Sequence, residues 1–254
     1  MIESQRHIKK IIIASIYLLI AATIIFFIVI NFFPPTPIVV EDKPLIQSLQ
    51  VTRSGKVDLG NGLVDFWAEI SNPNDDFGAS NLEYSFVLTN SNGEEITKNG
   101  DTFILPGDKR RYVLLFDISS EYELQRFEIN QDPEWTQLSR FNLPELVIRN
   151  TKIGDSPKVG NDFTAFGTLT NASPVNLKNI EVIAVITDDK DNIIGVNRTI
   201  IRDVLTLEAR DFEMTWQNEV VGTSIFNTKI YAQSNVLNNR ALLIELQQTP
   251  IFDR

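Results

Sequence analysis

The stretch Asp65-Phe66-Trp67-Ala68-Glu69-Ile70, followed by the breaker Asn72-Pro73-Asn74, decides the fold. Every second position in it, at Phe66, Ala68 and Ile70, is apolar and predicted to face a core. This period of two is that of a β-strand with one buried face. Residues 82–88 repeat the alternation, and the turn Leu105-Pro106-Gly107 separates them from a further strand at residues 112–116. We therefore expect antiparallel β-structure, with further inward positions at Leu82, Tyr84, Phe86, Leu88, Tyr112, Leu114 and Phe116.

The same order of strands and turns returns about one hundred residues later. Equivalent positions are 99 residues apart for Ile70 and Leu169, and 100 apart for Tyr112 and Phe212. Drift by single residues in loops is what duplication of one fold produces. The pattern predicts an all-β protein with two tandem Ig-like antiparallel β-sandwiches, residues 45–143 and 144–237. The strand order stays open, and the inward positions of the second unit are Ala165, Gly167, Leu169, Ile180, Val182, Ala184, Ile186, Phe212, Met214 and Trp216.

A family resemblance rests on the second unit. The segments that show the resemblance are residues 166–173, Phe-Gly-Thr-Leu-Thr-Asn-Ala-Ser, the strand at 177–182, the hairpin at 188–195 and the turn Leu207-Glu208-Ala209. These resemble the bacterial FxLYD-type domain, and both units are similar to water-stress (WHy) and related Ig-like modules. The second unit departs from the family where Glu208-Ala209 stands in place of Pro-Gly. The resemblance implies an envelope-facing Ig-like sandwich and no active site.

An uninterrupted apolar run occupies residues 11–30 and is preceded by Arg6, Lys9 and Lys10. A helix rises about 1.5 Å per residue and a bilayer core is about 30 Å thick, so roughly twenty residues span it. We expect a transmembrane helix at residues 11–33. The positive-inside bias places the basic flank, residues 1–10, in the cytoplasm and the bulk of the chain outside a plasma or inner membrane.

A cleaved signal peptide is the rival interpretation of this segment. The apolar region of such a peptide is usually about 7–15 residues long and ends at a small-x-small site. Here the run is longer, and bulky residues follow its only small pair, Ala21-Ala22. The sequence thus favours a retained anchor, which is followed by a proline-rich stalk at residues 34–44.

Composition limits the classes of function. The whole chain has 23 basic and 33 acidic residues, and removing the three basic and one acidic residue of the first ten leaves 20 and 32, a net charge of −12. An acidic ectodomain repels phosphate backbones, so nucleic acid is not an expected partner. The chain contains no cysteine, so disulfides and thiolate chemistry are excluded.

No catalytic, cofactor-binding or metal-binding residue is predicted. The single histidine, His7, lies in the basic flank, which removes a Ser-His-Asp triad and histidine metal sites from the ectodomain. The loop Asp188-Asp189-Lys190-Asp191-Asn192 offers oxygen ligands for calcium, but it lacks the glycine and terminal glutamate of an EF-hand and Lys190 opposes a cation, so a hairpin turn is the favoured interpretation. Asn171 and Asn197 begin N-glycosylation sequons, relevant only in a glycosylating organism.

Two features are candidates for partner binding. Trp67 lies opposite the inward face of its strand, where it either anchors a partner or is covered by a neighbouring strand, a loop or the second unit. The tail, residues 238–254, carries the apolar residues Leu242, Leu243 and Ile244. Because an exposed run of this kind is an aggregation hazard, we expect the tail to dock on the chain, with partner binding as the alternative.

These observations predict a non-catalytic, membrane-anchored extracytoplasmic protein whose two sandwiches bind a protein partner or set a spacing in a cell envelope. No small-molecule substrate is identified at this level. The alternative is an accessory single-pass subunit of a secretion or pilus-type machine. The apolar run contains no G-x-x-x-G motif and no charge, which favours a plain anchor.

Overall fold

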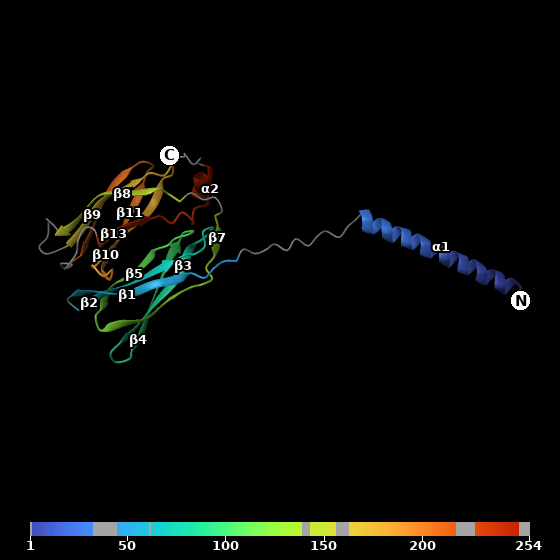
Figure 1. The fold of residues 1–254 in the computed structure, drawn as a ribbon, viewed down its shortest axis with the longest axis horizontal. Helices are drawn as coiled ribbons and strands as arrows, with labels where there is room; N and C mark the ends of the chain where they lie inside the picture. The colour runs from blue at the N-terminus through green and yellow to red at the C-terminus, as the bar shows by residue number, and fades with distance from the viewer. Residues whose placement is uncertain are drawn as a thin grey trace. The chain divides into compact units, whose positions relative to one another are not determined.

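The computed structural model describes residues 2–32, 45–60, 62–138, 143–155, 163–216 and 227–248. The chain divides into two compact units, Met1–Leu45 and Ile46–Arg254. The first contains the helix α1, and the second contains the strands and a short helix, α2 (Figure 1). The predicted stalk at residues 34–44 lies outside the described residues.

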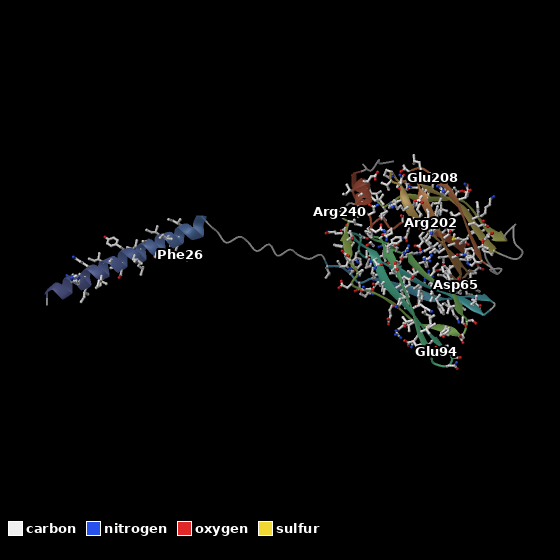
Figure 2. The ribbon with its side chains drawn as sticks, turned by 180° about the vertical axis from the view of Figure 1, so that it is seen from behind. Phe26, Asp65, Glu94, Arg202, Glu208 and Arg240 are labelled. Carbon is white, nitrogen blue, oxygen red and sulfur yellow. The ribbon has the colours of Figure 1, made fainter. Side chains whose placement is uncertain are left out.

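The helix α1 spans Ile2–Phe32. Its segment His7–Ile28 has a mean hydropathy of 2.9 and is long and apolar enough to cross a membrane. The side chains of this segment are exposed within the unit, as at Phe26, which is 61% exposed (Figure 2). A signal sequence near the N-terminus passes the same test of length and composition, so α1 confirms the apolar helix, whereas its role as a membrane anchor and its orientation stay predictions.

The second unit is dominated by antiparallel strands. Its elements are β1 (Gln50–Gly60), β2 (Leu63–Ser71), β3 (Phe77–Asn90), β4 (Glu95–Ile104), β5 (Arg111–Ser119), β6 (Tyr122–Ile129), β7 (Trp135–Gln137), β8 (Leu146–Asp155), β9 (Phe163–Asn171), β10 (Leu177–Thr187), β11 (Ile193–Val204), β12 (Ala209–Trp216), β13 (Thr228–Gln233) and α2 (Arg240–Gln248). We call β1–β7 the first half and β8–α2 the second half.

The two halves have the same sheet order. In the first half one sheet runs β1-β2-β5 and the other β4-β3-β6, with β7 also paired to β3. In the second half the sheets run β8-β9-β12 and β11-β10-β13. Each strand from β1 to β6 therefore has a counterpart seven strands later, at the same position in the corresponding sheet of the second half. This shared topology supplies the strand order that the sequence left open.

Each half has its own buried core between its two sheets. Phe66, Ala68 and Ile70 of β2 are fully buried, as the alternation predicted, and meet Leu82, Phe86 and Leu88 of β3. Burying a side chain of this size contributes about 1.5–3 kcal/mol. In the second half the predicted inward residues that form the core are Ala165, Leu169, Ile180, Val182, Ala184, Ile186, Phe212, Met214 and Trp216.

One predicted strand face is wrong. Tyr112 and Leu114 of β5 are buried, but they point away from the first-half core, which instead receives Val113. In the antiparallel ladder Val113 lies opposite Ala68, and directly opposed residues share a face. Residues 112–116 are all apolar, so the sequence alone allows either phase. The same ladders make Val113, not Tyr112, the counterpart of Phe212, because Phe212 lies opposite Gly167.

The structure also shifts the predicted alignment of one turn. The N–H of Asp108 donates to the carbonyl of Leu105 (3.2 Å), and the N–H of Glu208 donates to that of Leu205 (3.1 Å). Thr206-Leu207 therefore stands where the first half has Pro106-Gly107. Gly107 has φ 62° and so has Leu207, which is 74% exposed. A left-handed backbone suits glycine, whereas a leucine there is strained.

Candidate functional site

The two halves meet across a buried apolar cluster, which we call the apolar junction. From the first half it contains Val57, Trp67, Tyr112 and Leu114. From the second half it contains Ile183, Val185, Ile193 and Val196. The strand β10 is thus buried on both faces, because its alternate residues belong to the second-half core. Continuous apolar composition is what a strand covered on both sides requires.

Trp67, a predicted candidate for partner binding, lies inside the apolar junction. It is 7% exposed, and a methyl group added at Gly55 would lie 3.1 Å from its ring. Of the two alternatives for this residue, the structure shows the one in which the second half covers it. Trp67 therefore does not offer an exposed anchor to a partner.

The counterpart of this surface in the second half is more polar, although it includes Phe166, which is 37% exposed. Where Trp67 lies opposite Leu114 in the β2–β5 ladder, Phe166 lies opposite Glu213 in the β9–β12 ladder. Next to them, Thr168 donates a hydrogen bond to Asp211 over 2.8 Å. The duplicated halves therefore differ in the face that makes the junction.

A buried arginine links the halves beside the apolar junction. Arg111, at the start of β5, is 3% exposed and forms an ion pair with Glu181 of β10. Its guanidinium also donates to Thr102 (2.9 and 2.6 Å) and to Gln233 of β13 (2.9 Å), and it lies 4.0 Å above the ring centroid of Phe103. The side chain is thus satisfied on all sides by residues of both halves.

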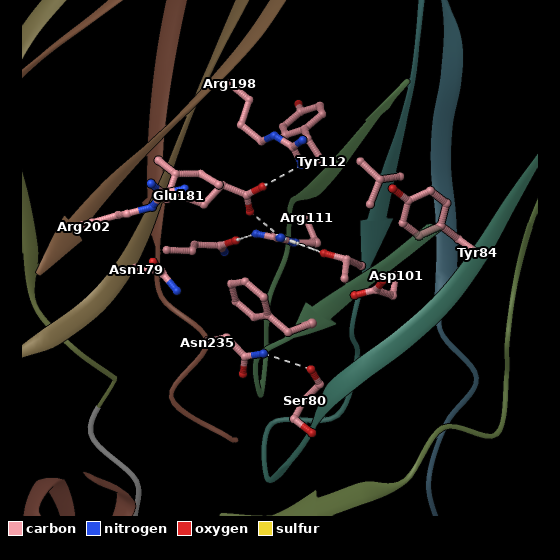
Figure 3. A pocket seen from close by; sticks show the side chains of 15 residues that line it. Ser80, Tyr84, Asp101, Arg111, Tyr112, Asn179, Glu181, Arg198, Arg202 and Asn235 are labelled. Carbon is pink, nitrogen blue, oxygen red and sulfur yellow. Dashed lines mark hydrogen bonds and ion pairs between the residues drawn. The ribbon is translucent and has the colours of Figure 1, made fainter. Parts of the chain in front are cut away.

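Further polar contacts extend this network. Arg198 of β11 pairs with the other oxygen of Glu181 over 3.2 Å (Figure 3). Gln233 also donates to Asp108 over 2.9 Å. Burial lowers the pKa of Arg111, and the charge of Glu181 opposes this effect. Removing one partner of a buried ion pair typically costs about 3–5 kcal/mol. The network therefore fixes the two halves against each other.

A second polar cluster lies at the opposite side of the same face. Glu69 accepts hydrogen bonds from Tyr112 (2.7 Å), Arg53 (2.9 Å) and Thr52 (2.8 Å). Burial raises the pKa of Glu69, but these hydrogen bonds outweigh burial and hold it below its ordinary value. Arg53 also forms an ion pair with Asp191, in the β10–β11 hairpin, over 3.4 Å. Charged contacts thus border the apolar junction on two sides.

A cavity of about 470 Å³ opens between the halves next to Arg111. Figure 3 shows side chains from both halves around it. The first half contributes Ser80, Tyr84 and Asp101, and the second contributes Asn179, Arg198, Ile200 and Arg202. We call it the junction cavity, and its lining makes it the candidate functional site of the chain.

The junction cavity has a positive balance of charge. Its lining includes three arginines, at 111, 198 and 202, and two carboxylates, at Asp101 and Glu181, which leaves a net charge of +1. Burial raises the pKa of Tyr84, so its hydroxyl stays protonated at neutral pH. Neither this hydroxyl nor the guanidinium of Arg202 has a hydrogen-bond partner among the described residues. The Tyr84 hydroxyl and the Arg202 guanidinium are therefore available to bind a ligand. The residues that line the cavity include no nucleophile paired with a base.

The predicted tail residues lie on α2. Leu246 of α2 is 2% exposed in the second-half core, and Leu242 and Leu243 pack against that core. Ile244 is 46% exposed on the other side of the helix. The helix therefore packs on the second half of the same chain. Residues 249–254 of the tail lie outside the described part of the chain.

The acidic loop at residues 188–192 is a hairpin turn. The carboxylate of Asp188 accepts the side-chain amide of Asn192 and the backbone N–H groups of Asn192 and Lys190, each over 2.8 Å, and these hydrogen bonds lower its pKa. Asp191 has φ 64° and pairs with Arg53. In the residues that the structure describes, no group of three or more His, Asp or Glu side chains is placed to hold a metal ion.

The sequon at Asn171 has a structural role. Its buried amide nitrogen donates to the carbonyls of Val175 (2.8 Å) and Leu205 (3.2 Å), which ties the turn before β10 to the turn after β11. Asn72 does the same in the first half, donating to Phe77 (2.6 Å) and Leu105 (2.9 Å). Asn171 is 0% exposed, so the folded chain does not present it for glycosylation.

Sequence reasoning did not find the residues of the junction cavity. Arg111 begins β5 directly after Lys109 and Arg110, and β10 contains Lys178 as well as Glu181, so neither charge stands out in the sequence. Their large separation in sequence also conceals the pair. Arg198 and Arg202 are four residues apart on β11 and therefore share a face of that strand. Only the packing of the second half on the first brings them near Tyr84.

Comparison with models of known protein families found no match, and comparison with curated proteins found none either.

Proposed function

We propose that this chain is a non-catalytic, single-pass membrane protein that presents a rigid pair of Ig-like sandwiches outside the cytoplasm. There they bind a protein partner or hold a fixed spacing in a cell envelope. The observation that carries the proposal is the junction between the halves, which combines buried apolar side chains with the Arg111–Glu181 pair. Such a junction favours one stiff body over two loosely linked domains.

The Ig-like assignment draws support from the sheet order. In Ig-type sandwiches strands A, B and E share one sheet, and strands C and F share the other, with C′ added to the latter in variable-type domains. The orders β1-β2-β5 and β4-β3-β6 fit this scheme when β1 to β6 are taken as A, B, C, C′, E and F. The second half fits in the same way, in keeping with the FxLYD-type resemblance.

The anchor assignment draws support from α1 and its flank. The segment His7–Ile28 is exposed along its whole length, and lipid is the solvent that suits such a surface. Arg6, Lys9 and Lys10 favour a cytoplasmic N-terminus. A reporter fused after Arg254 should therefore be active only outside the cytoplasm, and protease should remove the ectodomain from intact spheroplasts. A protected ectodomain would reverse the orientation.

Rigidity can be measured directly because the chain has no cysteine. Spin labels on cysteines at the exposed positions Lys98 of β4 and Lys152 of β8 report the distance between the halves. In the full chain in lipid nanodiscs, pulsed electron paramagnetic resonance should give one narrow distance distribution. Adding Leu114→Ala, which opens the apolar junction, should broaden it. A broad distribution in the parent protein would refute the rigid pair, whatever the topology test shows.

A further inference from the structure

We propose that the junction cavity binds a small carboxylate ligand, of the size of an acidic dipeptide or of a disaccharide of sugar acids. Ligand pockets commonly have volumes of about 300–1,000 Å³. The volume of about 470 Å³ lies within that range. The cavity is therefore large enough for two residues or two sugar rings, and too small to enclose a folded partner.

The negative charge of the ligand is inferred from the charged side chains that line the cavity. The ectodomain as a whole is strongly acidic, whereas the cavity lining has three arginines against two carboxylates. Glu181 is already engaged by Arg111 and Arg198. Arg202 is exposed and has no partner among the described residues. Its guanidinium remains available, and guanidinium groups bind carboxylates through charge-assisted, often bidentate hydrogen bonds.

The placement of the arginines gives the ligand a binding wall. Arg198, Ile200 and Arg202 occupy alternate positions of β11, so all three side chains point to one face of the strand. Ile200 is 48% exposed between the two cations. A ligand with a carboxylate at the arginines can therefore lay an apolar or ring surface on Ile200.

The first-half wall adds the side chains of Ser80 and Tyr84 and the carboxylate of Asp101, and the Tyr84 hydroxyl has no partner among the described residues. The amide of Asn179 lies beside Arg202, its partner in the β10–β11 ladder. Hydroxyl and amide groups can pair with the hydroxyls of a sugar or with the amides of a peptide. They do not distinguish the two sources, whose common chemistry is a carboxylate on a polar body.

The network around Arg111 preorganises the site. The guanidinium of Arg111 is saturated by Glu181, Thr102 and Gln233, so it serves as a fixed part of the wall. Because the walls come from different halves, the site exists only while the junction is closed. A rigid junction lowers the ordering cost of binding.

The test is isothermal titration calorimetry on the full chain in detergent micelles at low ionic strength. One arm uses an N-acetylated acidic dipeptide and the other uses digalacturonic acid. The amidated dipeptide and the methyl ester of the disaccharide are the uncharged controls. We expect one acid to bind saturably at one site per chain and its uncharged form not to bind. The acid that binds identifies the source, and binding should weaken as salt screens the arginines.

Variants locate the site. Arg202→Gln should weaken binding about tenfold, because one charge-assisted interaction is lost. Arg149→Gln is the matched control: Arg149 is exposed on β8, outside the cavity lining, and the change alters net charge equally. Tyr84→Phe should weaken binding about threefold by removing one hydroxyl. Circular dichroism melts should show that Arg202→Gln is folded, since the side chain of Arg202 has no partner to lose in the described parts of the chain.

Two results would overturn the proposal. The first is the absence of saturable heat with either acid at concentrations up to about 10 mM, well above the weakest useful affinity. The second is an equal loss of binding in Arg149→Gln and Arg202→Gln, which would make the effect one of net charge. Neither result bears on the rigidity of the halves or on membrane topology, so the proposed function would be unaffected.

Discussion

Replacing Asp65 by asparagine should stabilise the protein at neutral pH. Asp65 lies on β2, is 4% exposed and accepts the backbone N–H of Asp117 over 3.0 Å (Figure 2). Burial raises its pKa from 3.8 to about 6, more than the hydrogen bond from Asp117 lowers it. Asparagine keeps an oxygen acceptor of the same shape and carries no charge to desolvate.

The magnitude follows from proton linkage. Between pH 3.8 and about 6 the folded state binds more protons at Asp65 than the unfolded state does, so stability falls as pH rises through this window. A shift of about two units corresponds to roughly 3 kcal/mol at pH 7 and to about half of that at pH 5. Asp65→Asn should recover this free energy at pH 7 and less of it at pH 5.

Urea unfolding of the full chain, followed by tryptophan fluorescence at pH 5 and pH 7, measures both quantities. Asp58→Asn is the control, because Asp58 also accepts a backbone hydrogen bond, from Gly60 over 2.8 Å, but is exposed. The control should show no gain that grows with pH. If Asp65→Asn were no more stable than the parent at pH 7, or equally stabilising at both pH values, the desolvation argument would fail.

Three further outcomes can be checked by thermal or urea unfolding. Leu207→Gly should raise stability by roughly 1 kcal/mol, because it removes a left-handed leucine whose side chain is exposed; an unchanged midpoint would mean that the turn is not strained. Trp216→Ala should cost about 3–5 kcal/mol, since the indole is 5% exposed in the second-half core and donates to the carbonyl of Val196 over 3.0 Å; a loss below about 1 kcal/mol would contradict its core position. Truncation after Leu237 removes α2 and should lower the melting temperature by several degrees, because it uncovers the site of Leu246. An unchanged melting temperature, together with loss of a co-purifying protein, would instead assign the tail to partner binding.

Much of the fold could be predicted from periodicity alone. The alternation at Phe66, Ala68 and Ile70 predicted the correct face because the alternate positions 65 and 69 are acidic, which fixes the phase. Residues 112–116 lack such a marker, and the prediction there was wrong for that reason. A strand that is buried on both faces has no polar side to show which way it points.

The candidate site was not predictable because its parts are distant in sequence. Burial of Arg111 and Glu181 is tolerated only because the two charges form an ion pair, and no local sequence pattern predicts that they pair. The turn between β11 and β12 was predicted at Leu207-Glu208-Ala209, two residues too late, for a related reason. Leu207 occupies a left-handed position that glycine normally marks, so the turn carries no glycine signal.

The difference between the outer faces of the halves bears on how copies of the protein behave when crowded. The junction is heterologous, since one sheet of the first half lies on a different sheet of the second, and a repeated contact of that kind would grow into an open filament. Growth would require the sheet β8-β9-β12 of one copy to receive the sheet β4-β3-β6 of the next. The former displays the Thr168–Asp211 pair and the latter the Ser85–Asn99 and Thr89–Gln125 pairs. Stacking them would strip water from these polar groups without compensation, so the contact that joins the two halves within a chain does not repeat between chains.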